Sequence, residues 1–249
     1  MSSDDLFSLV VVGVTGDGKS TTCNTLAGSE IFDTSGGLGS ETTRCSHADY
    51  LYIGDEVRET RVVDTIGLHD TGLPAQEVMR RFAAFSDLVP CGIDLFVFVV
   101  RWGRFKPEHE AAVDAFVSNC GDSALSHMLL VFTSCSLSAE KLAETIEASA
   151  PDSLRRLLPK LPGPPVGIDN VKDAGAARSA LHAAIDTAAA ATGGKRYSNE
   201  ALAEARARFD AKQEEERLAF AAAVADWRKG SGPVHVEREP QPAAEAATV

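Results

Sequence analysis

Apolar residues fall along this chain in short runs that are separated by polar segments rich in turn residues. Three of these runs are almost entirely apolar, which is typical of strands buried on both faces of a sheet. Two further segments flank the turn sequence GDE and predict an antiparallel hairpin. The predicted strands are Leu6–Val12, Asp49–Ile53, Arg58–Val63, Leu95–Val100, Met128–Phe132 and Val166–Ile168.

Helical patterns alternate with these runs. Apolar residues recur at helical spacing between them, proline opens two of the segments, and Ser138 is placed to cap a third. The predicted helices are Lys19–Ala27, Pro74–Leu88, Pro107–Cys120, the segment after Ser138, and Ala174–Ala191. Strands that alternate with helices predict an α/β three-layer sandwich, with a mostly parallel sheet and one antiparallel hairpin at its edge.

A long helix is predicted after this domain, from Ser198 to Arg228. Its last part carries Phe220, Val224 and Trp227 at the spacing i, i+4, i+7, which forms one apolar face. We expect this face to pack back on the domain, and a partner-binding helix is the alternative. The predicted organisation is a domain over 1–195, a helical extension over 196–230 and a disordered acidic tail over 231–249.

Composition narrows the class of protein. The net charge of −12 repels phosphate backbones and anionic lipid surfaces, so nucleic acid is not an expected partner. The five cysteines are scattered without a CxxC pair, which argues against a disulfide framework and a zinc site. No apolar run is long enough for a transmembrane helix and the first residues do not resemble a signal peptide, so we expect a cytoplasmic protein.

The first predicted strand runs directly into GVTGDGKS, Gly13 to Ser20, which has the spacing of a P-loop. Glycines let successive backbone N–H groups point at phosphate oxygens, Lys19 would neutralise the β and γ phosphates, and Ser20 would offer a hydroxyl to Mg²⁺. The residues predicted to hold the phosphates are Gly13, Thr15, Gly16, Asp17, Gly18, Lys19, Ser20 and Thr21.

The third predicted strand ends in VVDTIGL, which places Asp64 at its carboxyl end beside the P-loop. A carboxylate there can hold Mg²⁺, and Gly67 can present its N–H to a γ-phosphate. The hydroxyl-rich loop between these motifs offers Thr42 or Thr43 as a further Mg²⁺ ligand, and we favour Thr42.

Together these residues resemble the GTPases of immunity-associated proteins, the GIMAP or avirulence-induced family, which are related to septins and to chloroplast import-receptor GTPases. The resemblance covers about residues 6 to 200 and includes GVTGDGKSTTCNTLAG, VVDTIGLHD, RWGRFKPEHEAAVDAF, VFT, GIDN and RYSNE. It implies a P-loop GTPase domain, bound GTP or GDP, dependence on Mg²⁺, and nucleotide-controlled self-association across the nucleotide face.

One departure concerns hydrolysis. Signalling GTPases usually have a water-orienting glutamine after the DxxG motif, where this chain has Leu68, and a hydrocarbon cannot orient water. Intrinsic hydrolysis should then be slow. A second subunit can assist in the family, and His69 and Arg104 are the candidates for that role here, although an idle loop position and a structural role are the alternatives.

A second departure concerns the base. By the resemblance, the loop Thr133 to Leu137 reads the base, and Ser136 stands where the family has an aspartate. Hydrogen bonds to a charged group are worth about 1.5–3 kcal/mol each, so their loss predicts a weaker guanine preference. Thr133, Ser134, Ser136 and Asn170 remain candidates for contacts to the ring.

The sequence therefore favours a Mg²⁺-dependent GTP-binding protein with slow GTPase activity that works as a switch or scaffold through dimerisation. Leu68 and Ser136 keep two alternatives open. One is a pseudo-GTPase with negligible turnover, and the other is a P-loop protein that prefers ATP.

Overall fold

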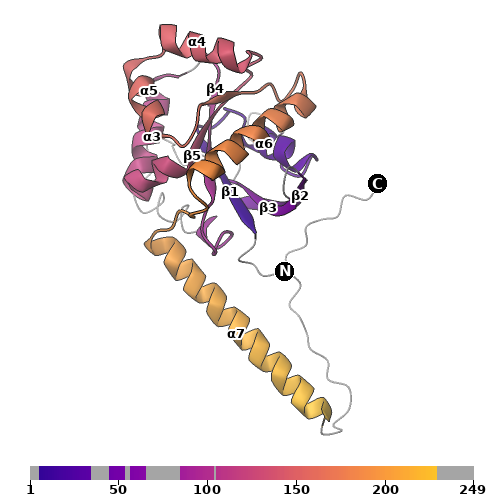
Figure 1. Cartoon of the computed structure of the whole chain (residues 1–249). Coiled ribbons are helices and arrows are strands. Elements are labelled where there is room, and N and C mark those ends of the chain that lie inside the picture. Colours follow the sequence, from indigo (N-terminus) through magenta and orange to yellow (C-terminus); the bar gives the residue numbers. More distant parts are fainter. Residues whose placement is uncertain (1–5, 35–44, 54–56, 66–84, 104, 229–249) are drawn as a thin grey trace.

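The computed structural model describes residues 6–34, 45–53, 57–65, 85–103 and 105–228 (Figure 1). A six-stranded sheet forms its centre, with strand order β2-β3-β1-β4-β5-β6. All neighbouring strands are parallel except β2 and β3, which form the antiparallel edge. The predicted sheet is confirmed. The strands are β1 (Phe7–Gly13), β2 (Ser46–Ile53), β3 (Val57–Asp64), β4 (Leu95–Arg101), β5 (Met128–Thr133) and β6 (Val166–Gly167).

Helices cover both faces of this sheet (Figure 1). One face packs against α1 and α6 through Leu26, Leu181 and Ile185, and the other packs against α3 and α4 through Phe116 and Leu142. Both faces of the central strands are buried, which explains their uninterrupted apolar sequences. The helices are α1 (Lys19–Ala27), α3 (Pro107–Cys120), α4 (Ala139–Ser149), α5 (Asp152–Leu157), α6 (Ala174–Ala191) and α7 (Glu200–Arg228), with 3₁₀ turns η2 (Asp122–His127) and η3 (Leu158–Lys160).

Most of the predicted helix Pro74–Leu88 lies outside the described residues. The other helices match their predicted positions, and α1, α3 and α6 have the predicted bounds. Ser138 caps α4 as expected, since its side chain accepts a hydrogen bond from the Lys141 N–H. In the part of the chain that the structure covers, no helix combines the length and the apolar character of a membrane span.

The start of α7 is fixed to the domain by the segment just before it. The Arg196 guanidinium donates to Asp94 Oδ1 at 3.1 Å and to the Leu6 carbonyl at 2.8 Å. The Tyr197 hydroxyl donates to the Cys120 carbonyl at 2.7 Å, and Leu202 on the first turn is fully buried. The RYSNE sequence therefore anchors the helix to the domain.

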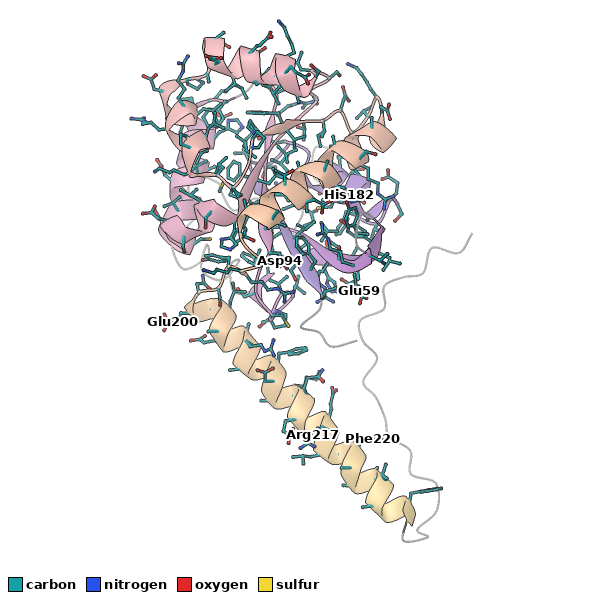
Figure 2. The ribbon with its side chains drawn as sticks, viewed as in Figure 1. Glu59, Asp94, His182, Glu200, Arg217 and Phe220 are labelled. Atoms are coloured by element: carbon teal, nitrogen blue, oxygen red, sulfur yellow. The ribbon has the colours of Figure 1, made fainter. Side chains whose placement is uncertain are left out.

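Beyond Arg208 α7 leaves the domain, which corrects the expectation that its apolar face packs back (Figures 1 and 2). Phe220 is 59% exposed and Trp227 is 66% exposed. The helix axis points away from the sheet, so no described part of the domain lies beneath the predicted face. The spacing of Phe220, Val224 and Trp227 identified a face of the helix, but it carried no information about what covers that face.

Candidate nucleotide site

The glycine-rich turn between β1 and α1 takes a shape that glycine alone permits at two points. A Cβ atom at Gly13 would lie 2.4 Å from the Val99 carbonyl oxygen on the neighbouring strand β4, which excludes any side chain there. Gly18 has φ of 96° at the start of α1, in the left-handed region that favours glycine. The turn therefore lies tightly against β4 and exposes backbone rather than side chains, as phosphate binding requires.

Lys19 is buried in this turn. Its Nζ donates to the Val14 carbonyl oxygen at 3.2 Å, which places the ammonium group over the turn rather than in solvent. A buried cation held at a helix N-terminus strengthens the local positive field for a phosphate, in a chain whose net charge is negative.

Two interactions hold Asp17, at the tip of the turn. The Thr133 hydroxyl at the end of β5 donates to the Asp17 carbonyl oxygen at 2.7 Å. On the other side, His109 Nε2 lies 2.8 Å from Asp17 Oδ2, and both side chains are buried. The Lys106 N–H donates to His109 Nδ1, so Nε2 carries the proton and donates to the carboxylate. The turn is thereby connected to α3 and to the end of β5.

Sequence reasoning did not identify His109. It lies on the first turn of α3, in the segment RWGRFKPEHE that supported the family resemblance. The helical spacing of His109, Ala112 and Phe116 could have identified it, because these residues share one buried helix face. A buried histidine needs a polar partner.

At the end of β3, Asp64 meets the start of α1. The Ser20 hydroxyl donates to Asp64 Oδ2 at 2.5 Å, and Oδ1 is buried without a hydrogen-bond partner among the described residues. Burial raises the pKa of Asp64, while the Ser20 hydrogen bond and the charge of Lys19 oppose that shift. A hydroxyl beside an unsatisfied carboxylate oxygen is a fitting pair of hard oxygen ligands for Mg²⁺.

The loop after β5 lies beside the loop after β6. The Cys135 N–H donates to the Ile168 carbonyl at 2.8 Å, which joins the two loops through their backbones. Ser134 has φ of 53°, a left-handed conformation that is uncommon for residues other than glycine and often marks a functional loop. The Ser136 hydroxyl donates to Asp169 Oδ2 at 2.9 Å.

Asn170 faces α1 rather than open space. Its Oδ1 accepts from the Thr25 hydroxyl at 2.9 Å, and its Nδ2 donates to Thr22 Oγ1 at 3.1 Å. Contact between Asn170 and a base stays a prediction, and such a contact would compete with the hydrogen bonds to Thr22 and Thr25. The predicted residues Thr42, Thr43, Gly67, Leu68, His69 and Arg104 lie outside the described part of the chain.

A mostly parallel sheet whose first strand leads through a glycine-rich turn into a helix, with an acidic residue ending the adjacent strand, defines a P-loop nucleoside triphosphatase domain. The model of the AIG1 family matches residues 7–216, and this chain belongs to that family.

Curated relatives agree with this assignment. The chain is 28% identical over 148 residues to immune-associated nucleotide-binding protein 7 of Arabidopsis thaliana, which covers 59% of this chain and 46% of the relative. The chain spans less than half the length of the curated Arabidopsis relatives it matches.

Among solved structures, Arabidopsis thaliana Toc33 in complex with GDP and Mg²⁺ aligns with a TM-score of 0.56 and 19% identity, over 78% of this chain and 86% of that one. A second solved structure, described by the words "Dimerization is important for the GTPase activity of chloroplast translocon components atToc33 and psToc159", aligns with a TM-score of 0.54 and 19% identity, over 77% and 85%. At this level of identity the likeness concerns the fold.

Proposed function

We propose that this protein binds GTP and GDP with Mg²⁺, hydrolyses GTP slowly, and acts as a switch or scaffold through nucleotide-dependent dimerisation. The observation that carries the proposal is the pair formed by Ser20 and Asp64, with one carboxylate oxygen buried and without a partner among the described residues. A buried, unsatisfied carboxylate oxygen destabilises a fold unless a ligand uses it.

The proposed roles follow from position. Backbone N–H groups of the turn from Gly13 to Gly18 and of Thr21 would bind phosphate oxygens, and Lys19 would add its charge. Ser20, Asp64 and Thr42 would hold Mg²⁺, which when bound neutralises charge on the phosphates. Thr15, Gly16 and Asp17 complete the turn. Within it Asp17 acts through its backbone, because its side chain is engaged by His109.

Slow turnover follows from the sequence after Asp64. Gly67 would present its N–H to the γ-phosphate, but Leu68 has no group that can orient water. A second copy of the chain would then supply what is missing, and His69 and Arg104 are the residues proposed for that contact. Dimerisation is described as important for the GTPase activity of atToc33 and psToc159, which is the precedent in this fold.

Phosphate release measured over a range of protein concentrations tests the proposal. We expect the rate per molecule to rise with concentration, because a second copy completes the site. Lys19→Ala should abolish nucleotide binding while circular dichroism shows a folded chain. A folded Lys19→Ala protein that binds nucleotide as the native chain does would overturn the proposal, and a rate per molecule that does not change with concentration would overturn the dimeric part.

Negligible turnover at every concentration would instead identify a pseudo-GTPase. The exposed face of α7 favours a scaffold role in either case, because Phe220 and Trp227 offer apolar surface away from the nucleotide site. A protein effector at this face is part of the proposal. Preference for ATP is the third candidate, and it is favoured by the absence of a carboxylate at position 136.

A further inference from the structure

A carboxylate lies beside the loop after β5, although that loop itself has a serine at position 136. Asp169, in the loop after β6, brings Oδ2 to 2.9 Å from the Ser136 hydroxyl, which donates to it. The Asp169 side chain is 14% exposed, so it lies within the joined loops and still reaches the surface. The two residues are 33 positions apart in the sequence, and only the fold brings them together.

The position of this carboxylate is well defined. Asp169 Oδ1 accepts from the backbone N–H groups of Lys172, at 3.1 Å, and Val171, at 3.3 Å. These bonds, first that of Lys172 and then that of Ser136, lower the pKa of Asp169, so it is ionised at neutral pH. The Ile168 N–H, just before it, donates to the Phe132 carbonyl. The loop is therefore fixed to the end of β5.

A simpler interpretation is that Asp169 caps its own loop. That role accounts for Oδ1, and an asparagine would serve it equally well, because an amide oxygen accepts the same backbone bonds. Oδ2 has other partners: it accepts from the Ser136 hydroxyl in the other loop and lies 3.4 Å from Lys172 Nζ. At the position of Oδ2 aspartate offers an acceptor on a negatively charged group, whereas asparagine would offer an NH₂ donor.

The location of the pair relative to the phosphate site is set by the strand order. Phosphates bound at the turn after β1 would have the metal ligand Asp64 on the β3 side. The nucleoside then extends to the opposite side, over the ends of β5 and β6, along the crevice at the carboxyl ends of the strands. Thr133 and Asn170, which contact the P-loop and α1, border this path.

We propose that Asp169 is the residue that selects guanine in this protein, with Ser136 positioning its carboxylate. Guanine presents two adjacent N–H donors, N1–H and the 2-amino group, which a carboxylate can accept together. Adenine presents an unprotonated ring nitrogen at the corresponding edge, which a carboxylate repels. This inference rests on the proposed function, because it assumes that a purine nucleotide occupies the P-loop.

Calorimetric titration of the full chain with GDP, XDP and ADP, each with Mg²⁺, tests the inference by using Asp169→Asn. An amide oxygen can accept from N1–H, and its NH₂ group can donate to the 2-oxo group of xanthine but repels the 2-amino group of guanine. We expect the native chain to prefer GDP, and the variant to lose about tenfold or more of its GDP affinity while gaining affinity for XDP. The backbone bonds to position 169 are retained in the variant.

Asp173→Asn is the matched control. Asp173 caps α6 in the same loop by accepting from the Ala176 N–H, and it has no contact with Ser136. Asp173→Asn should leave the order of the affinities for GDP, XDP and ADP unchanged. The exchanged variant Ser136→Asp with Asp169→Ser returns a carboxylate to the first loop, and it should recover the preference for GDP over XDP.

The outcomes separate the inference from the proposed function. A folded Asp169→Asn protein that prefers GDP as the native chain does overturns the role of Asp169 and leaves nucleotide binding intact. If Asp169→Asn does not fold, failure of the exchanged variant to prefer GDP overturns the role instead. A native chain that binds none of the three nucleotides overturns both.

Discussion

At the end of β3, Asp64 is the residue whose environment most directly suggests a ligand. One carboxylate oxygen accepts from Ser20, and the other is buried with no partner in the described structure. Burial raises the pKa of Asp64. Because the folded state holds the proton more tightly than the unfolded chain, the favourable contribution of Asp64 is fully present below about pH 4 and is lost as the pH rises through its folded-state pKa.

Asp64→Asn should therefore stabilise the protein without nucleotide at neutral pH. Removing the buried charge should raise the unfolding temperature at neutral pH, and the gain should shrink below about pH 4. The same variant should lose the stabilisation that Mg²⁺ and nucleotide give the native chain. Differential scanning calorimetry over a range of pH measures both effects.

Asp49→Asn is the control, because Asp49 is a partly exposed carboxylate paired with Arg61 and such pairs contribute about 0–1 kcal/mol. A lower unfolding temperature for Asp64→Asn at neutral pH would show that the carboxylate is satisfied in the protein, contrary to its proposed role.

His109 provides a second prediction about a single residue. His109→Ala leaves the buried Asp17 Oδ2 without its donor, which should cost about 1–3 kcal/mol and weaken nucleotide binding, because the tip of the P-loop is no longer held. His109→Gln should restore most of the stability and most of the nucleotide affinity, since the amide of glutamine can place an N–H group near the position of Nε2. Thermal unfolding and calorimetric titration measure the two effects.

His127→Ala is the matched control, because His127 is a half-buried histidine at the end of η2 whose Nε2 lies 3.0 Å from the Lys195 carbonyl oxygen rather than near the P-loop. It should have a smaller effect on both stability and nucleotide binding. Equal loss of nucleotide affinity in His109→Ala and His109→Gln would contradict the proposed hydrogen bond, because the two replacements differ in whether they can donate to Asp17.

Some residues proposed for the site could be named from the sequence, whereas others could be named only from the structure. Short sequence motifs of neighbouring residues contain Lys19, Ser20 and Asp64, so these residues can be recognised without knowing the fold. His109 contacts Asp17 across 92 positions and Ser136 contacts Asp169 across 33, so neither contact follows from local spacing. Such pairs depend on which loops the sheet brings together.

At the scale of elements, the predicted bounds of α1, α3 and α6 were confirmed because helical periodicity, proline and glycine mark them locally. The prediction that the end of α7 packs on the domain was wrong, although the helix itself was predicted. The spacing of apolar residues shows which side of a helix is apolar. Whether the domain covers that side depends on the direction in which the preceding chain leads the helix.

Removing residues 214–249 should leave the domain stable, because the buried Leu202 and Ala205 and the Arg208 contact with Asp87 all precede the cut. We expect an unfolding temperature within about 2 °C of the full chain and unchanged nucleotide affinity. Leu202→Ala in the full chain should lose about 2–4 kcal/mol, since it empties a fully buried position on the first turn of α7.

Thermal unfolding compares these variants. A fall of more than about 5 °C on truncation, roughly 1–2 kcal/mol for a chain of this length, would show that the exposed part of α7 does pack on the domain.

For the whole molecule, the negative net charge has to be overcome locally at the turn that carries Lys19. A net charge of −12 would repel a nucleotide from most of the surface, whereas the start of α1 and Lys19 concentrate positive field at one place. Copies of the chain should also repel one another at low ionic strength, so the proposed dimer should become tighter as salt is added.

The central claim is that this chain holds a guanine nucleotide with Mg²⁺. Calorimetric titration of the full chain with a non-hydrolysable GTP analogue and with the matching ATP analogue, each with Mg²⁺, tests it most directly. We predict binding of the guanine nucleotide that is about tenfold tighter or more than binding of the adenine nucleotide. Absence of binding to either would contradict the account.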